Sequence, residues 1–460
     1  MLLRKTPNTF YHRCIFFSIV VGWLLMVVCA LLGHTIKVGD ETRYLTATWE
    51  MWSQHSFLVP LLHGHPYPDK TPLMFWLFHF GWWLFGVNLW WFQVVPALLA
   101  FVCLGLTYQL AKALWPEDAN VRWLAPLILL STLYWSRFMT SIRFDLPVVC
   151  AVLLSHLAIL SARNKIQSLW WRFGLALGFG LFSKGPAVLV SLLPTALLAP
   201  YCFPDLPIKR WSWQLLMALV LGTAIVLFWA VPAAIHGGAI YRDAIFWHQS
   251  VDRIIGAHGL YQNTRGLFYY PLELSIMLLP WFIWPPLWQY LWRLRQQTLP
   301  GEIRFLFIAI LTPIIIFSLI PFKSNRYMLP IIPSFSVLVA WAMAKRIQLQ
   351  DRITAAEKWT VTLLLLVFAG LIVCLPWIQS QSILHSHLYD FLHKISPLTG
   401  IAIVAIAIAW QVWPQQKLAP YIIVLAILGF ACVAIDSLLS QQPQNIAIFQ
   451  QLTHSQSPTG

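Results

Sequence analysis

The amino-acid sequence predicts an all-α integral membrane protein. Of its 460 residues, 59% are hydrophobic and only 10% are charged, and the mean hydropathy is +0.69. A soluble domain carries about 25% charged residues, so this chain cannot build a water-covered surface of normal charge density. Its apolar segments are also long and continuous, whereas the strands of a membrane β-barrel are short and alternate in polarity.

The apolar segments predict about thirteen transmembrane helices, because a helix that crosses the bilayer needs about 20 mainly apolar residues. The first span, 14–32, follows Arg4, Lys5 and Arg13, and we interpret it as a retained signal anchor with a cytoplasmic N-terminus. The segment 73–86 is too short to cross, and its Trp and Phe residues predict an interfacial helix. The other predicted spans are 90–111, 123–140, 146–162, 167–183, 186–203, 212–235, 268–292, 304–320, 327–344, 357–377, 398–413 and 419–439.

The basic residues follow this topology only in part. The chain has 30 Lys and Arg against 16 Asp and Glu, a formal net charge of +14. Of the 30 basic residues, 18 lie on the predicted cytoplasmic side, which leaves 12 outside. This bias has the sign that membrane proteins show. Because topology accounts for the positive charge, we predict no nucleic-acid partner, and the external charges need another explanation.

The external charges gather in a few segments that together carry acidic and basic residues, several of them beside Gly or Pro. These segments are 39–44 and 65–72 of the first loop, 143–145, 183–186, the central loop 236–270, and 321–327. Headgroup-facing charge alone does not require carboxylates at tight turns. We interpret the set as a site at the membrane–water boundary, where Lys and Arg would hold a phosphate or diphosphate. A carboxylate among them would accept a proton or bind a metal.

Other chemistries find no support in the sequence. It contains no Walker loop and no G-x-G-x-x-G fingerprint, so nucleotide hydrolysis and dinucleotide chemistry get no support. Its seven cysteines form no C-x-x-C pair, so neither a disulfide framework nor a zinc site is predicted.

The charged segments form a series of motifs that resembles a known family. In chain order the motifs are Asp40–Tyr44, Pro66–Pro72, Arg143–Pro147, Ser183–Pro186, Trp247–Tyr270, Leu279–Trp281 and Lys323–Pro330. Their order and spacing resemble the GT-C glycosyltransferases that use lipid-linked sugars, above all the lipid A aminoarabinose transferases and the related bacterial protein O-mannosyltransferase-like family. Thr71 stands where the family usually has Pro, and Asp69 where the aminoarabinose enzymes usually have Glu.

The resemblance implies a GT-C fold and a glycosyltransferase that takes a sugar from a polyprenyl (undecaprenyl) phosphate carrier. The acceptor would be lipid A, another envelope glycan or a protein, on the outer face of the bacterial inner membrane, with membrane lipids as further partners. The catalytic loops would be periplasmic. The implied organisation is a transmembrane catalytic module at 1–345 with outer loops 33–89 and 236–270, further transmembrane helices at 346–440, and a short polar tail at 441–460.

The resemblance also implies roles for individual residues. Asp40 would be the catalytic carboxylate, as a general base toward a hydroxyl acceptor or as an orienting group toward a phosphate acceptor, with Glu41 and Asp145 sharing that work. The donor phosphate would be stabilised first by Lys70 and Arg253, then by Lys184, Lys323 and Arg326. The supporting residues are Arg43, Tyr44, Asp69, Arg143, His258 and Tyr327. No cofactor is established, although Mg²⁺ or Mn²⁺ is compatible with oxygen ligands, and the candidate ligands are Asp40, Asp69 and His258.

Two other classes of function stay open. A secondary transporter would place ionisable residues near the bilayer midplane, often in repeated halves. The predicted spans carry few such residues, mainly Glu273 and Asp436, and no internal repeat is visible. A non-catalytic assembly protein or flippase partner would tolerate the loss of Asp40 and Lys70, whereas an enzyme should not.

Overall fold

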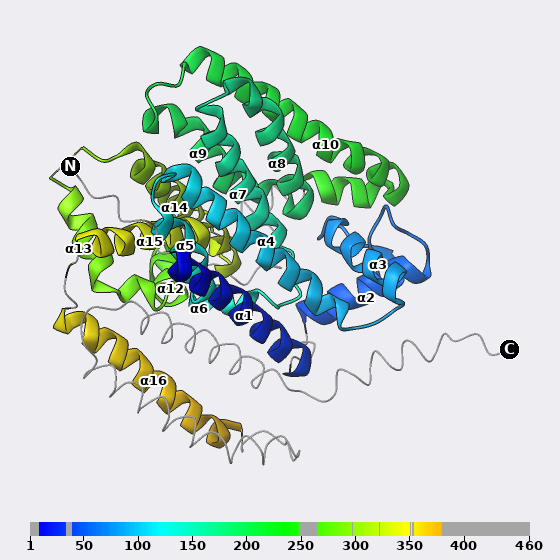
Figure 1. Cartoon of the computed structure of the whole chain (residues 1–460). Coiled ribbons are helices and arrows are strands. Elements are labelled where there is room, and N and C mark those ends of the chain that lie inside the picture. The colour runs from blue at the N-terminus through cyan, green and yellow to red at the C-terminus, as the bar shows by residue number, and fades with distance from the viewer. Residues whose placement is uncertain are drawn as a thin grey trace.

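The computed structural model describes residues 9–33, 39–247, 265–296, 298–321, 323–349, 351 and 354–379. These residues form helices apart from the connecting loops and one short hairpin (Figure 1). The predicted spans 398–413 and 419–439 and the polar tail lie outside the described residues. In the hairpin, strand β1 (Leu61–Leu62) runs antiparallel to β2 (His65–Pro66), with Leu62 opposite His65.

The described residues form α-helices and short 3-10 helices. The α-helices are α1 (Thr9–Gly33), α2 (Asp40–Ser53), α3 (Leu73–Phe85), α4 (Trp91–Leu114), α5 (Ala119–Leu130), α6 (Leu133–Phe138), α7 (Asp145–Ala162), α8 (Leu169–Lys184), α9 (Leu189–Cys202), α10 (Ile208–Asp243), α12 (Tyr269–Met277), α13 (Pro285–Leu294), α14 (Gly301–Leu319), α15 (Ile332–Leu349) and α16 (Ala355–Gln379). The 3-10 helices are η1 (Ile166–Ser168), η2 (Gly185–Val188), η4 (Trp281–Ile283) and η5 (Asn325–Ile331).

Several helical segments are long and apolar enough to cross a membrane. Within the described residues there are 7 of them: Tyr11–Val28, Trp91–Leu114, Asp145–Ala162, Ile166–Cys202, Ile208–Trp247, Gly301–Leu319 and Asn325–Leu349. Each overlaps one predicted span, except Ile166–Cys202, which contains two, 167–183 and 186–203, as helices α8 and α9. These segments confirm an all-α, multi-pass membrane protein. They do not confirm the predicted number of thirteen spans.

Two predicted spans are wrong because each one is broken. The span 123–140 divides at Thr132, where the backbone is extended, and the amide of Leu133 donates to the carbonyl of Leu279 at 2.9 Å instead of continuing the helix. The span 268–292 divides into α12, η4 and α13 around Pro280 and Pro285, which have no N–H to donate to a helix. The two breaks therefore meet, joined by one hydrogen bond between distant segments.

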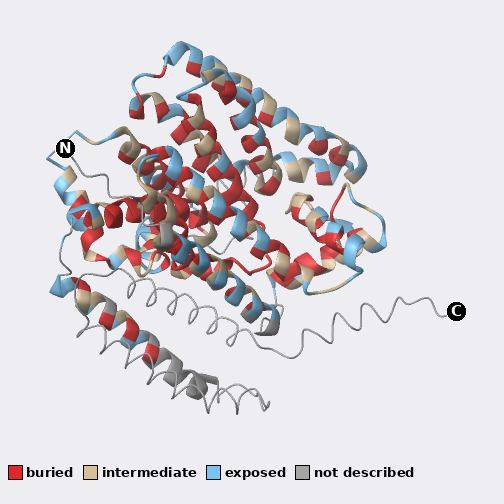
Figure 2. Cartoon of the chain, in the orientation of Figure 1, coloured by how far each residue is buried: buried red, intermediate tan, exposed pale blue. Residues whose placement is uncertain are grey.

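The core lies around α7, which packs against α4 and α8, and Figure 2 shows buried residues along these central helices. On its other side α8 packs closely against α10. Gly174 and Gly178 lie one turn apart on α8, and a Cβ added to Gly178 would lie 2.7 Å from the Ile225 side chain on α10. Gly222 on α10 leaves the same small space for Leu177. Small residues at this spacing let membrane helices approach closely and pack without a hydrophobic driving force.

Charged residues lie at both ends of the bundle. α7 begins at Asp145 and ends near Arg163, which lies 3.5 Å from Glu302 at the start of α14. The same end holds a buried ion pair between Arg346 and Glu357, which joins α15 to α16. These ion pairs neutralise charged residues at the end of α7 opposite Asp145. The predicted site residues gather at the other end, near Asp145.

Helices α2 and α3 pack together beside the bundle (Figure 1), and the hairpin, which lies between them in the sequence, contacts α2. Met51 of α2 and Met74 and Phe78 of α3 are fully buried in their shared core. The other face of α3 exposes Phe80 and Trp83. The predicted interfacial helix is therefore present as a helix with one packed and one exposed apolar face. Helix α2 was not predicted, because charged residues interrupt its apolar residues and no long apolar segment is visible in the sequence.

His79 joins α3 to α2 and should make stability depend on pH. Its Nε2 lies 2.9 Å from the carbonyl oxygen of Thr48, which fits a neutral ring that donates from Nε2. Burial lowers the pKa of His79 from its ordinary value of about 6.5. The unfolded chain therefore binds this proton more readily, and the free energy of unfolding should fall as the pH drops below about 6.5.

Thermal unfolding of the purified protein in detergent, measured between pH 8 and pH 5, tests this expectation. His79→Gln should flatten the loss of melting temperature at acid pH. His236→Gln provides the control, because His236 is exposed and its ring contacts only its own helix, at the carbonyl of Pro232. If the melting temperature of His79→Gln depends on pH as that of the wild type does, the His79 ring is not the cause of this pH dependence.

Candidate functional site

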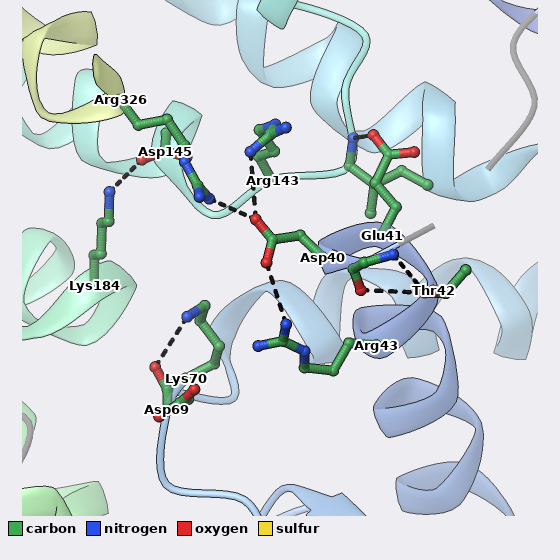
Figure 3. A network of polar contacts seen from close by, with 12 residues as sticks. Asp40, Glu41, Thr42, Arg43, Asp69, Lys70, Arg143, Asp145, Lys184 and Arg326 are labelled. Atoms are coloured by element: carbon green, nitrogen blue, oxygen red, sulfur yellow. Dashed lines mark hydrogen bonds and ion pairs between the residues drawn. The ribbon is translucent and has the colours of Figure 1, made fainter. Parts of the chain in front are cut away.

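Asp40 is the centre of the charged network at the Asp145 end of the bundle (Figure 3). It is the first residue of α2 and follows Gly39, whose φ of 114° turns the chain into the helix. Its carboxylate lies 2.9 Å from a guanidinium nitrogen of Arg326, 3.5 Å from Arg143 and 3.7 Å from Arg43. Three arginines from separate segments thus converge on one carboxylate.

Asp145 forms the second centre of the network. It is the first residue of α7 and is 3% exposed, and its Oδ1 pairs with Nζ of Lys184 at the end of α8. Arg326 pairs with Asp40 and also lines the same pocket as Asp145, whose charge it feels electrostatically. The Lys184 ammonium also lies 4.7 Å from the ring centre of Tyr327. A buried carboxylate requires such partners, because an isolated buried charge is very costly.

Lys70 reaches the network from the loop that follows the hairpin. Its ammonium donates to the carbonyl oxygen of Asp69 at 3.2 Å and lies 5.7 Å from the ring centre of Tyr44. In Figure 3 Lys70 lies on the side of Asp40 away from Arg143. Burial raises the pKa of the neighbouring Tyr67 to about 12, with the Asp69 carboxylate acting in the same direction, so this hydroxyl stays neutral.

Glu41 has a different place from the one expected of a catalytic carboxylate. It is 1% exposed, and its Oε1 accepts a hydrogen bond from the amide of Ile142 at 3.3 Å. Ile142 belongs to the loop that carries Arg143 into the site. The structure therefore gives Glu41 the geometry of a positioning residue, which fixes the loop between α6 and α7 against the start of α2.

Lys323 is also reassigned. It is 3% exposed, and its ammonium donates to the carbonyls of Phe317 at 3.0 Å and Ile320 at 2.7 Å, and to that of Ser318. These carbonyls lie at the C-terminal end of α14, where a helix leaves its last carbonyls without intrahelical partners. A cation at this end also interacts favourably with the helix dipole. The ammonium that was expected to bind a phosphate therefore caps α14.

A pocket opens beside Asp145 and combines a charged end with an apolar wall. Its polar lining is Asp145, Lys184, Ser191, Arg326 and Tyr327, and its apolar lining is Val148, Ala187, Val188, Phe317 and Pro330. The walls come from α7, α8, η2, α9, α14 and η5. The sequence motifs identified the charged end. They missed Val148 and Ser191, although Val148 could have been found one helical turn after Asp145 on the same face of α7.

The arrangement favours an anion over a cation. Five basic side chains, Arg43, Lys70, Arg143, Lys184 and Arg326, surround the carboxylates of Asp40 and Asp145. No three His, Cys, Asp or Glu side chains gather as a metal site within the part of the chain that the structure describes. The guanidiniums around Asp40 also fit a divalent cation poorly. Arg253 and His258 lie outside the described residues.

Comparisons with known proteins agree with this geometry. Residues 69–236 match the family model described as dolichyl-phosphate-mannose-protein mannosyltransferase. The chain is 28% identical over 391 residues to an undecaprenyl phosphate-alpha-4-amino-4-deoxy-L-arabinose arabinosyl transferase 2 of Pseudomonas fluorescens, covering 82% of this chain and 68% of that protein. It is 27% identical to the corresponding transferase of Pseudomonas aeruginosa strain LESB58, covering 73% of this chain and 60% of that protein.

Solved structures show the same fold. The crystal structure of ArnT from Cupriavidus metallidurans bound to undecaprenyl phosphate superposes with a TM-score of 0.76 at 17% identity, covering 98% of this chain and 82% of that chain. The arabinosyltransferase EmbB from Mycobacterium smegmatis gives a TM-score of 0.52 at 14% identity, covering 98% of this chain and 44% of that chain.

The fold is that of the GT-C membrane glycosyltransferases, as predicted. The chain is similar in sequence to the undecaprenyl phosphate-aminoarabinose arabinosyl transferases and in fold to ArnT, which confirms the resemblance that the sequence motifs indicated.

Proposed function

We propose that this protein is a glycosyltransferase that moves 4-amino-4-deoxy-L-arabinose from undecaprenyl phosphate to lipid A. The observation that carries the proposal is the pocket beside Asp145, which is lined by the cations Lys184 and Arg326 and by apolar side chains. A polyprenyl phosphate has the same two parts, an anionic head and an apolar chain. The names of the relatives supply the sugar, and the motif resemblance supplies the acceptor.

The site faces the periplasm and the N-terminus is cytoplasmic in this proposal. The excess of basic residues assigned to the opposite end of the bundle supports that orientation, since cytoplasmic loops accumulate Lys and Arg. A lipid-linked donor and a lipid acceptor can then meet in the outer leaflet of the inner membrane, each with its apolar part in the bilayer.

In the proposed reaction the bond between the sugar carbon and the carrier phosphate oxygen breaks, and the phosphate keeps the electron pair. Negative charge builds on that phosphate, and Lys184, Arg326 and Lys70 are placed to stabilise it. Donors fixed in advance where charge develops are the largest single contribution in many enzymes. The prenyl chain would follow the apolar wall at Val148 and Phe317.

The new bond forms between the same sugar carbon and an acceptor oxygen near Asp40. A hydroxyl acceptor loses its proton to Asp40, which acts as a general base. A phosphate acceptor is already ionised and needs no base, and Arg143 and Arg43 then orient it beside Asp40. In both cases the described residues act by positioning and charge.

Two rival functions differ in their predicted products. A protein O-glycosyltransferase is favoured by the description of the matching family model. A transporter is disfavoured, because the charged network lies at helix ends instead of the midplane. Glu273, one of the two ionisable residues expected inside a span, lies on the short helix α12 and accepts from Asn325 at 3.3 Å. Asp436 lies outside the described residues.

Mass spectrometry of envelope lipids tests the proposal. Cells that express the intact chain should show lipid A with the added mass of one aminopentose, and cells without the chain should not. The same increment on glycoproteins, with unchanged lipid A, would replace the lipid acceptor by a protein. Unchanged lipids, glycoproteins and envelope polysaccharides would overturn the transferase and leave transport as the leading function.

A further inference from the structure

The hairpin before Lys70 is fastened to α2 by one carboxylate. Glu50 accepts the amide hydrogens of His63 at 2.7 Å and of Gly64 at 2.9 Å, one on each of its oxygens. Both turn residues have positive φ, 56° and 75°, as a two-residue hairpin turn requires. Hydrogen bonds to an ionised acceptor are about twice as strong as neutral ones. The loop therefore begins from a fixed point on the helix that starts with Asp40.

The other end of the loop is fastened to α8. Thr71 donates its hydroxyl hydrogen to the carbonyl oxygen of Ser183 at 3.1 Å. Ser183 is fully buried in the last turn of α8, where helix carbonyls need partners from outside the helix. The next residue is Lys184, which pairs with Asp145. The hydrogen bond between Thr71 and Ser183 thus connects the residue that follows Lys70 with the residue that precedes Lys184.

We propose that Thr71 is a positioning residue, which with Glu50 sets the place of the Lys70 ammonium relative to Lys184 and Asp40. This inference rests on the proposed function, since it assigns the two lysines to one carrier phosphate. Lys70 lies in the segment between the hairpin turn that Glu50 holds and Thr71, and it directly precedes Thr71. Small displacements of a positioned group cost catalysis far more than they cost folding.

Other contacts hold α3 in place without the Thr71 hydrogen bond. The Trp76 indole donates to the carbonyl of Phe57 at 2.7 Å, and its ring lies 5.3 Å from that of Phe182 on α8. A variant that lacks only the Thr71 hydroxyl should therefore fold. Thr71→Val keeps the branched shape and removes the donor, and Thr71→Ser keeps the donor.

The test compares binding of a polyprenyl phosphate with binding of the uncharged polyprenol to the full-length protein in detergent. Thr71→Val should weaken binding of the phosphate about tenfold, because the Lys70 ammonium loses its fixed position beside the phosphate. Its affinity for the polyprenol should stay at the wild-type value, and its melting temperature should fall by no more than the few degrees that one hydrogen bond accounts for. Thr71→Ser should restore phosphate binding.

Thr360→Val is the matched control, because the Thr360 hydroxyl bonds only within α16, to the carbonyl of Ala356. Phosphate binding by Thr71→Val that equals the wild type overturns the positioning role. So does an equal loss for the phosphate and the polyprenol, which indicates general disruption of the pocket. If the wild-type protein binds neither lipid, the proposed function itself is wrong. This result differs from the two above, which concern only the role of Thr71.

Discussion

Replacing Asp40 by Asn should reduce sugar transfer by about 10²- to 10⁴-fold, the range of general acid–base catalysis. Asn has the shape of Asp but accepts no proton and carries no charge toward the three arginines around it. The carrier phosphate should still bind, and at least as tightly as to the wild type, because the remaining cations lose a competing carboxylate. Transfer is measured from the mass of the product, and carrier binding by titration of the purified protein.

Asp243→Asn provides the matched control. Asp243 is exposed at the end of α10, where it pairs with Arg242 at 3.0 Å, and it should be replaced without loss of transfer. Near-full transfer by Asp40→Asn would refute the assignment of Asp40. Loss of carrier binding together with transfer would instead show that Asp40 holds the site together, without a role in the chemical step.

Replacing Arg326 by Lys should reduce transfer by about 10²-fold or more, comparable to the loss of one donor to a developing charge. Arg326 contacts Asp40 at 2.9 Å, interacts with Asp145 and lines the pocket, so it faces two carboxylates and the proposed phosphate at once. The planar guanidinium can offer donors in several directions, whereas a Lys ammonium is a single compact charge. The same positive charge on Lys therefore should not rescue the arginine.

Carrier binding should weaken in Arg326→Lys, in contrast to Asp40→Asn. This opposite response separates the residue that holds the donor from the residue that acts on the acceptor. Arg242→Lys, which changes the exposed pair with Asp243, should keep both binding and transfer. If Arg326→Lys transfers sugar at the wild-type rate, the Arg326 guanidinium has no special part in the reaction.

The broken spans show where sequence patterns stop being informative. The apolar stretch 123–140 carries no feature that marks Thr132 as a break, because the amide of Leu133 finds its partner at Leu279, far along the chain. Hydropathy measures whether a segment prefers the membrane, not whether its backbone hydrogen bonds are made within the segment. Pro280 and Pro285 are a local sequence signal for the second break. Hydropathy does not register this signal, because the segment stays apolar across both prolines.

Some site residues could be predicted from the sequence, because a charged residue next to a turn is visible in the local sequence. Asp40, Asp145, Lys184 and Arg326 were each expected, and the structure brings them together. The roles of Glu41 and Lys323 were not predictable. Each is as charged and as close to a motif as its neighbours, yet one fixes a loop amide and the other caps α14.

The sequence by itself determined that this protein is a helical membrane protein with clusters of charged residues between its apolar segments, because hydropathy and charge are summed along the chain and need no folded partner. Its motifs also determined the family that it resembles. Only the tertiary structure decided which charges share a site, which ones are used by helix ends, and which apolar residues line the pocket below Asp145. The physical reason is that hydrogen bonds and ion pairs over a few ångströms depend on helix packing, which brings together residues that no local pattern connects.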